Sequence, residues 1–421
     1  MKSNSLLRQL SHGEVAFYKT SLSIATISEV LGEIPFQILQ RCFEILLQKH
    51  PILHCCVTER EGTQYFTLRA SKKQKAQIVE YSDQGEVHKY FQEIINSTLD
   101  PQKSLIEITV LKPSPSIKNI TSTYILTHVS HIVSDGMCNI ALHSELLALC
   151  DQILTNTPIS NNEGFKNKSL PLPIEDRLPH RTDGATVDDM VKKHADLITA
   201  IEHQDLHINT PPSTSHQIEV FSQTFSEDET LKILSWCKKR NLSFNTVLTA
   251  ALLISAHSAT HQHNFLVRNA VNLRAKVTPP LNPNEFITSA SSILTSTTIQ
   301  QDDDLETLSH KVCSSINQAL VEVPFIENHI ANKEINKYLD MPLAFHISNM
   351  GKLNINPIYE SFSLESILIA PGTSCGKTLP IVISSFKNKL SITTHALKDL
   401  YPQKHVQKIV LGAINLILSP N

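Results

Sequence analysis

The fold is decided by residues 121–150, which read TSTYILTHVSHIVSDGMCNIALHSELLALC. As far as Val129, side chains alternate with the two-residue period of a β-strand. A helical pattern follows from about Met137, and its expected stripe consists of Ile140, Ala141, Ser144, Leu147 and Ala148. The stretch therefore predicts a strand-to-helix turn that carries His131, Asp135 and Gly136, from which a side chain can project from the sheet edge into a cleft.

The residues of this turn allow more than one chemistry. A histidine near neutral pH can act as a general base, but a single histidine in a turn, such as His131, can equally be structural. Asp135 can cap the following helix by accepting backbone N–H bonds, or it can pair with a distant cation. Gly136 lets the backbone turn tightly.

Composition limits the class of protein. The chain has 421 residues, and domains usually contain roughly 100–200, so two sizeable domains are expected. Lys and Arg number 37 against 40 Asp and Glu, a net charge of −3, which argues against nucleic acid or an anionic membrane as the main partner. A hydrophobic share of 41% excludes disorder over most of the length.

Several sequence features favour a cytoplasmic protein. Residues 1–10 carry no signal-peptide pattern, and the longest apolar runs, 247–256 and 409–418, fall short of the ~18–20 residues that span a bilayer. We expect both runs to form buried helices. The eight cysteines are scattered without a C-x-x-C spacing, which favours reduced, mostly buried thiols over disulfides or a zinc site.

Helix and strand patterns alternate, so we expect a mixed α/β fold. Helices are predicted over residues 36–50, 227–240 and 244–256, and in the second of these Leu231, Leu234 and Trp236 are expected along the apolar side. Strands are predicted over residues 122–129, 265–271, 343–347, 381–386 and 390–394, the last two joined by a hairpin at residues 387–389. Pro171, Pro173 and Pro179 mark a connector, which divides the chain into a lobe of residues 1–165, a linker of 166–185 and a lobe of 186–421.

The His131-x-x-x-Asp135-Gly136 pattern, after a strand and before a helix, resembles the signature of the CoA-dependent acyltransferase superfamily. That superfamily includes peptide condensation domains, plant BAHD enzymes, alcohol acetyltransferases and phthiocerol dimycocerosyl transferases. Further resemblances follow in the expected order: RQL at 8–10 with Glu14, LLQKHPIL at 46–53, the linker at 170–179, AVNLR at 270–274 and ISNMGKL at 347–353. The last favours the alcohol acyltransferase and phthiocerol transferase branches. One departure is Ser130, where the family usually carries a first histidine.

This resemblance implies two chloramphenicol-acetyltransferase-like lobes, each a mixed sheet flanked by helices, with a tunnel between them. His131 would be the general base, and Asp135 would form a bidentate pair with Arg274 of the second lobe and hold the turn beside Gly136. Ser348 and Asn349 would donate hydrogen bonds to the acyl carbonyl, or would simply end a strand at a tight turn.

The resemblance also implies the substrates. No cofactor or metal would be bound permanently, and the acyl donor would be acyl-CoA or the acyl-phosphopantetheine of a carrier protein. We expect transfer to a hydroxyl of a small molecule, giving an ester. Amide formation on an amine and a non-catalytic module that docks carrier proteins are the alternatives.

Three other motifs point elsewhere. GTSCGKT at residues 372–378 has three residues between its glycines, where a phosphate-binding P-loop has four, and a strand pattern follows it, so we expect a surface turn. His257, His261 and His263 have metal-like spacing, but no acidic residue or cysteine lies near them to complete a zinc site. The three aspartates at 302–304 are expected in a solvated loop or at a helix start.

Overall fold

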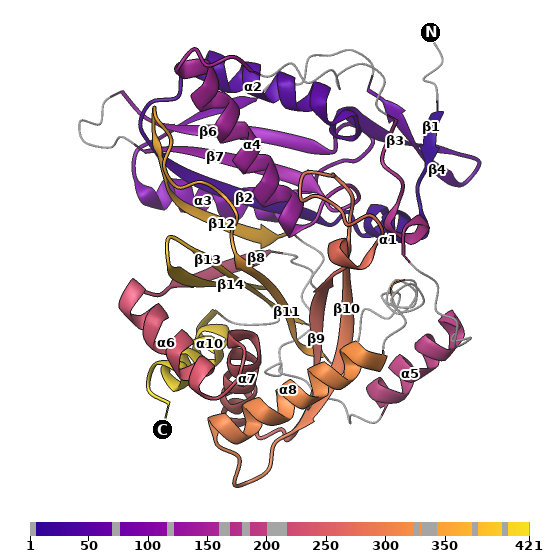
Figure 1. The fold of residues 1–421 in the computed structure, drawn as a ribbon, viewed down its shortest axis with the longest axis vertical. Coiled ribbons are helices and arrows are strands. Elements are labelled where there is room, and N and C mark those ends of the chain that lie inside the picture. The colour runs from indigo at the N-terminus through magenta and orange to yellow at the C-terminus, as the bar shows by residue number, and fades with distance from the viewer. Residues whose placement is uncertain are drawn as a thin grey trace. The chain divides into compact units, whose positions relative to one another are not determined.

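The predicted strand of the motif forms β7 (Ser122–Ser130), buried along its whole length within a five-stranded sheet. The computed structural model describes residues 6–69, 76–115, 122–159, 169–178, 186–199, 217–322, 329, 343–372, 378–397 and 403–420. The order of the sheet is β12-β2-β7-β6-β5, with β2 (Ser23–Leu31), β5 (Gln77–Tyr81), β6 (Ile106–Pro113) and β12 (Ser363–Pro371). All neighbours are antiparallel except β5 and β6. Figure 1 labels β12, β2, β7 and β6 of this sheet.

Helices cover both faces of this sheet. Thr127 and Tyr124 of β7 differ by an odd number of positions, so their side chains leave opposite faces. Thr127 bonds to His143 of α4 (Gly136–Leu154), whereas Tyr124 accepts a bond from Gln84 of α3 (Gln84–Asn96). A further helix, α2 (Phe36–Lys49), contacts α4 and continues into the short 3₁₀ helix η1 (Pro51–His54). The buried face of α4 is wider than the expected stripe, because Cys138, Asn139, Leu142, His143, Leu146 and Cys150 are also buried.

The N-terminal part of the chain also forms a small three-stranded antiparallel sheet. Its order is β1-β4-β3, with β1 (Leu6–Gln9), β3 (Cys55–Arg60) and β4 (Thr63–Leu68). The helix α1 (His12–Thr20) follows β1 and buries Gly13, Glu14 and Phe17.

The C-terminal half builds a six-stranded mixed sheet in the order β10-β9-β11-β13-β14-β8. The strands are β8 (Ile218–Thr224), β9 (Asn264–Asn272), β10 (Ala290–Thr298), β11 (Leu343–Lys352), β13 (Leu379–Phe386) and β14 (Lys389–Leu397). Its helices are α5 (Val187–Thr199), α6 (Glu227–Lys239), α7 (Phe244–Thr260), α8 (Leu305–Glu322) and α10 (Gln403–Leu418). The central helix α7 is buried almost all round, as its sequence predicted, and contacts α8 and α10.

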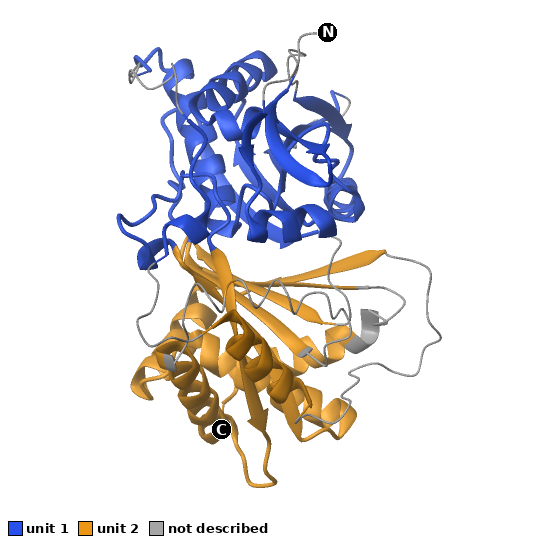
Figure 2. Ribbon diagram, turned by 90° about the vertical axis from the view of Figure 1, so that its right-hand side faces the viewer, with its two compact units in different colours: residues 1–178, 274–289, 353–374 blue, residues 179–273, 290–352, 375–421 orange. Residues whose placement is uncertain are grey.

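The chain forms two compact units that are not contiguous in sequence. Unit 1 contains residues 1–178, 274–289 and 353–374, and unit 2 contains residues 179–273, 290–352 and 375–421 (Figure 2). The boundary at 178 falls in the proline-spaced linker, but the contiguous lobes expected from the sequence do not describe these units. The reason is visible in the sheet, because β12 from the C-terminal half pairs with β2 over its whole length.

Most predicted elements agree with the structure to within a few residues, and one prediction of a helix face is wrong. Leu231 and Leu234 of α6 are 63% and 42% exposed, while Thr230, Ile233 and Cys237 are buried. The hydroxyl oxygen of Thr230 accepts a hydrogen bond from the backbone N–H of Leu390 at 3.0 Å. This bond satisfies a polar group in the core, so the inward face of α6 is not the most apolar one.

The hairpin and the cysteines agree with the predictions. Phe386 and Lys389 pair across a two-residue turn in which Lys387 and Asn388 both have positive φ. The seven described cysteines are free thiols, six of them buried, and Cys375 lies outside the described residues. Among the described helices, no single one is long and apolar enough to cross a membrane; only α6 and α7 together pass that test, and a bend of 98° separates them.

Candidate functional site

Residues 130–136 form the predicted turn, the His131 turn, and hydrogen bonds to its backbone hold it in place. The N–H of His131 donates to the carbonyl of Leu22 at 2.9 Å, and the Thr288 hydroxyl donates to the carbonyls of His131 and, at 3.3 Å, of Ser134. The hydroxyl of Ser130, at the place of the family's first histidine, accepts from the N–H of Ile132 at 3.4 Å. A serine thus supports the turn from that position.

The imidazole of His131 lies against an aromatic ring. Phe17 of α1 stacks on it with 4.2 Å between ring centroids and 3° between ring planes. His131 is half-buried, and Phe17 is buried. One face of the imidazole is therefore covered by Phe17, and its Nδ1 is buried.

The helix that carries Phe17 is fixed at its N-terminus by three acidic and basic groups. Ser11 and Glu14 form a capping box, and Arg8 binds both carboxylate oxygens of Glu14 at 2.6 and 2.9 Å. Glu175, in the segment that resembles the family linker, accepts from the Ser11 hydroxyl at 3.0 Å and the Gly13 N–H at 2.8 Å. The opening motif and the linker therefore meet at the start of α1.

Asp135 caps a helix and binds a cation at the same time. Its Oδ1 accepts from the N–H of Cys138 at 3.0 Å, which caps α4. Its Oδ2 accepts from the hydroxyl and N–H of Ser289 at 2.6 and 3.1 Å and lies 3.3 Å from Nη2 of Arg274. Burial alone would raise the pKa of Asp135, but the charge of Arg274 and the Ser289 hydroxyl hold it below its usual value.

The ion pair differs from the expected one in two respects. It is not bidentate, because Arg274 also donates to the carbonyls of Asn282, Glu285 and Ile287, at 2.6 to 3.3 Å. Nor does it join two units, because Asp135 and Arg274 both belong to unit 1. Arg274 opens a 3₁₀ turn and is 4% exposed, so it is not a solvated strand end. The guanidinium therefore ties the segment 274–289 to the His131 turn.

The HP motif of the N-terminal half packs on the same segment. His50 lies 2.6 Å from a carboxylate oxygen of Glu145 on α4, and its ring meets Phe286 edge-on at 4.6 Å between centroids. Asn284 donates a hydrogen bond to the carboxylate of Glu145 at 3.1 Å, and Lys49 forms an ion pair with the same carboxylate. Burial opposes ionisation of Glu145, but His50, Lys49 and Asn284 lower its pKa to about 2. Motifs far apart in sequence thus converge around α4.

Behind the turn, His143 is a buried structural histidine. Its Nδ1 lies 2.6 Å from the Ser28 hydroxyl and its Nε2 lies 2.8 Å from the Thr127 hydroxyl. Burial lowers its pKa to about 3, so the ring is neutral at physiological pH. His128, His131 and His143 lie on a strand, in a turn and on a helix, as their sequence positions predicted.

We expect the free energy of unfolding of His143→Gln to fall less steeply with decreasing pH than that of the native protein. A folded pKa below the free value of 6.5 stabilises the fold above about pH 6.5, and that stabilisation is lost as the pH falls toward 3. Between these values each pH unit removes about 1.4 kcal/mol per such group. Urea unfolding at pH 7, 6 and 5 should give a smaller loss in the variant than in the native protein. The same substitution at the exposed His88 should change nothing, and an unchanged slope in His143→Gln would contradict the assignment.

Comparisons with known proteins agree with this architecture. Residues 214–395 match the family model described as the phthiocerol/phthiodiolone dimycocerosyl transferase C-terminus. The trichothecene 15-O-acetyltransferase TRI3 from Fusarium sporotrichioides aligns with a TM-score of 0.77 at 15% identity, over 98% of this chain and 94% of that one. The chain has the fold of the condensation-domain and acyltransferase superfamily. The resemblance inferred from the motifs is confirmed at that level.

Two further structures share this acyltransferase and condensation fold. Polyketide synthase associated protein 5 from Mycobacterium tuberculosis gives a TM-score of 0.72 at 15% identity, over 98% of both chains. The first condensation domain of the calcium-dependent antibiotic synthetase gives 0.74 at 13% identity, over 99% of this chain and 98% of that one. No curated protein matches the sequence.

Ser348 and Asn349 lie in unit 2, near the end of β11. Ser348 is half-buried and Asn349 is exposed. The side-chain oxygen of Asn349 accepts from the N–H of Gly351 at 2.9 Å, and Gly351 has φ +64°. Asn349 therefore shapes a register shift inside β11, which pairs with β13 (Leu379–Phe386) again at Lys352, so the strand does not end at Gly351 as one of the two interpretations expected.

The competing motifs bring no second site together. His257 and His263 each place Nδ1 near a backbone carbonyl, and the described residues contain no group of three potential metal ligands. Residues 373–377 of the P-loop-like stretch lie outside the described residues, but the strand predicted after it is β13. Asp304 accepts from the N–H of Thr307 at 2.7 Å at the start of α8, as expected of a helix start.

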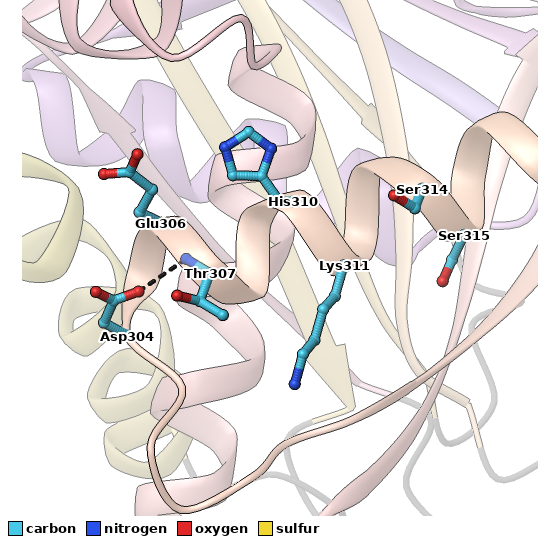
Figure 3. Close-up of a pocket in the computed structure, with 7 residues that line it drawn as sticks. All are labelled: Asp304, Glu306, Thr307, His310, Lys311, Ser314 and Ser315. Carbon is cyan, nitrogen blue, oxygen red and sulfur yellow. Dashed lines mark hydrogen bonds between the residues drawn. The ribbon is translucent and has the colours of Figure 1, made fainter.

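A depression of about 740 Å³ lies along α8 and is lined by Asp304, Glu306, Thr307, His310, Lys311, Ser314 and Ser315. Figure 3 shows His310 and Lys311 pointing to opposite sides of the helix. The lining side chains do not converge on one point, so this depression does not have the arrangement of a catalytic site.

Sequence reasoning missed three residues around the acyltransferase motif: Phe17, Thr288 and Ser289. Each contacts the His131 turn from a segment more than a hundred residues away in the chain. The only signal for Phe17 was its place shortly after the RQL motif. Thr288 and Ser289 belong to a polar run before β10, which carries no signal of its own.

Proposed function

We propose that this protein is an acyltransferase that moves an acyl group from a thioester to an acceptor hydroxyl, with His131 as the general base. The observation that carries the proposal is the His131 turn, whose backbone is fixed at Leu22 and Thr288 and whose Asp135 is bound by Arg274 and Ser289. An imidazole in a half-buried residue whose turn is held in place suits general base catalysis. The family match and the O-acetyltransferase likeness support the same reaction class.

The proposed reaction is direct transfer. A nitrogen of His131, which we take to be Nε2, removes the proton of the acceptor hydroxyl as its oxygen attacks the thioester carbonyl carbon. The tetrahedral intermediate collapses, the C–S bond breaks, and the thiolate takes the proton from the imidazolium. Base catalysis of this kind contributes roughly 10²–10⁴ in rate. Asp135 and Arg274 would touch no reacting atom and would hold the turn in place.

Ser348 and Asn349 are proposed as contacts of the acyl carbonyl. The Asn349 side-chain oxygen is bonded to Gly351, so its amide N–H groups are the part offered to a ligand. Donors placed where negative charge develops stabilise the tetrahedral oxyanion.

The proposed donor is acyl-CoA or the acyl-phosphopantetheine of a carrier protein, with no permanently bound cofactor. The names of two structural neighbours, a polyketide synthase associated protein and a domain of an antibiotic synthetase, favour a setting in which carrier proteins occur. The likeness to that condensation domain also supports amide formation on an amine acceptor as the second candidate.

We expect the purified protein to release thiol from at least one acyl thioester only when an alcohol is present. The test offers acyl-CoAs of increasing chain length and the same acyl groups on a phosphopantetheinylated carrier, each with a set of alcohols and amines. Mass spectrometry identifies the product. An ester supports the proposal, and an amide alone supports the condensation alternative. Tight carrier binding without any transfer would overturn both and indicate a docking module.

A further inference from the structure

We propose that Phe17 is a positioning residue for His131, whose ring fixes the plane of the imidazole. This inference rests on the proposed role of His131 as a base. It assigns to α1, which contributes no polar group to the reaction, the task of aiming the catalytic ring.

The stack leaves the imidazole little rotational freedom. Its ring and that of Phe17 are parallel to within 3° at 4.2 Å between centroids. Rotation of the imidazole about its χ2 angle would drive its edge into the Phe17 ring, so the flat face of Phe17 selects one plane. The nitrogens lie on the edge of the imidazole and are not covered by a ring stacked on its face. An aliphatic side chain of similar size would fill the space without selecting that plane.

The position of Phe17 is itself fixed from both ends of α1. At the N-terminus, Glu175 binds Ser11 and Gly13. At the C-terminus the helix ends at Ser21 in the left-handed region, and the next residue, Leu22, accepts the N–H of His131. One short segment therefore holds both the backbone and the side chain of His131. A shift of α1 would move the proposed base with it.

The test compares Phe17→Leu, which removes the flat ring, with Phe17→Tyr, which keeps it. Phe91→Leu is the matched control, because Phe91 is also buried in a helix of unit 1. NMR gives a readout that does not depend on activity. The His131 C–H resonances, identified by their loss in His131→Ala, should lie upfield through the ring current of Phe17. Phe17→Leu should move them downfield, and Phe91→Leu should leave them in place.

Activity supplies the second readout. Phe17→Leu should lower kcat about 10-fold with KM within about 2-fold, since misaligned groups lose rate rather than affinity. Phe17→Tyr should recover most of that loss, and Phe91→Leu should show little effect on kcat. Unmoved resonances in Phe17→Leu would overturn the stack, and unchanged kcat would overturn the positioning role. Full activity of His131→Ala would instead remove the proposed base while leaving the NMR result intact.

Discussion

His131→Ala should lower kcat for acyl transfer by roughly 10²–10⁴, the usual contribution of a positioned general base. The backbone bonds of the turn to Leu22 and Thr288 involve main-chain atoms of residue 131, so they persist in the variant. The Asp135–Arg274 contact does not involve the imidazole either. The circular dichroism spectrum and the urea midpoint should therefore stay close to those of the native protein.

The measurement is initial-rate thiol release with the acyl thioester and alcohol that the native protein accepts. His88→Ala is the matched control, because His88 lies exposed on α3 in the same unit. That control should keep native activity. Transfer by His131→Ala at the native rate would exclude His131 as the base.

Asp135→Asn should lower the free energy of unfolding by about 3–5 kcal/mol, the usual cost of removing one partner of a buried ion pair. Asparagine caps helices nearly as well as aspartate, so the cap on α4 survives. What is lost is the negative charge beside Arg274, a residue that is 4% exposed and would stay buried without its counter-ion, together with the acceptor for the N–H and hydroxyl of Ser289. We also expect transfer to fall by more than about 10²-fold, because the turn that carries His131 keeps its Thr288 bonds but loses its charged contact with the segment 274–289.

Urea unfolding and initial rates measure the two effects. Asp83→Asn makes the same change at the N-cap of α3, where the carboxylate accepts from the N–H of Glu86. That control should cost well under about 1 kcal/mol. The double variant Asp135→Asn/Arg274→Met removes both charges but also the bonds of Arg274 to the carbonyls of Asn282, Glu285 and Ile287. Its loss of stability should therefore be smaller than the sum of the losses of the two single variants, without recovery of activity. Equal free energies of unfolding of Asp135→Asn and Asp83→Asn would contradict a stabilising role of the buried Asp135–Arg274 pair.

Most helices and strands could be predicted from the local spacing of apolar residues. The strand, turn and helix around His131 were predictable because alternation and a 3.6-residue repeat are written into adjacent residues. Contacts such as Phe17 on His131 join segments that have no shared period, so no pattern in the sequence reports them. The partners Asp135 and Arg274 stand 139 positions apart, and only the family resemblance put them together.

The errors have physical causes of the same kind. Leu231 and Leu234 indicated the apolar side of α6, but both are exposed. Thr230 lies on the buried face instead, because its hydroxyl accepts a hydrogen bond from the N–H of Leu390 in β14. Contiguous lobes were expected because the linker is the clearest break in composition. The hydrogen bonds of β12 to β2 override that order, since strand pairing is not limited by distance along the chain.

The interleaved composition of unit 1 has a consequence for biosynthesis. The chain leaves the ribosome from its N-terminus, so His131 and Asp135 emerge long before Arg274, Ser289 and the edge strand of residues 363–371. During translation, β2 has an unpaired edge and Asp135 lacks its counter-ion. The nascent N-terminal part cannot reach its final form until residues 274–289 and 363–371 have also emerged, so the site around His131 completes its folding only after these later segments are made.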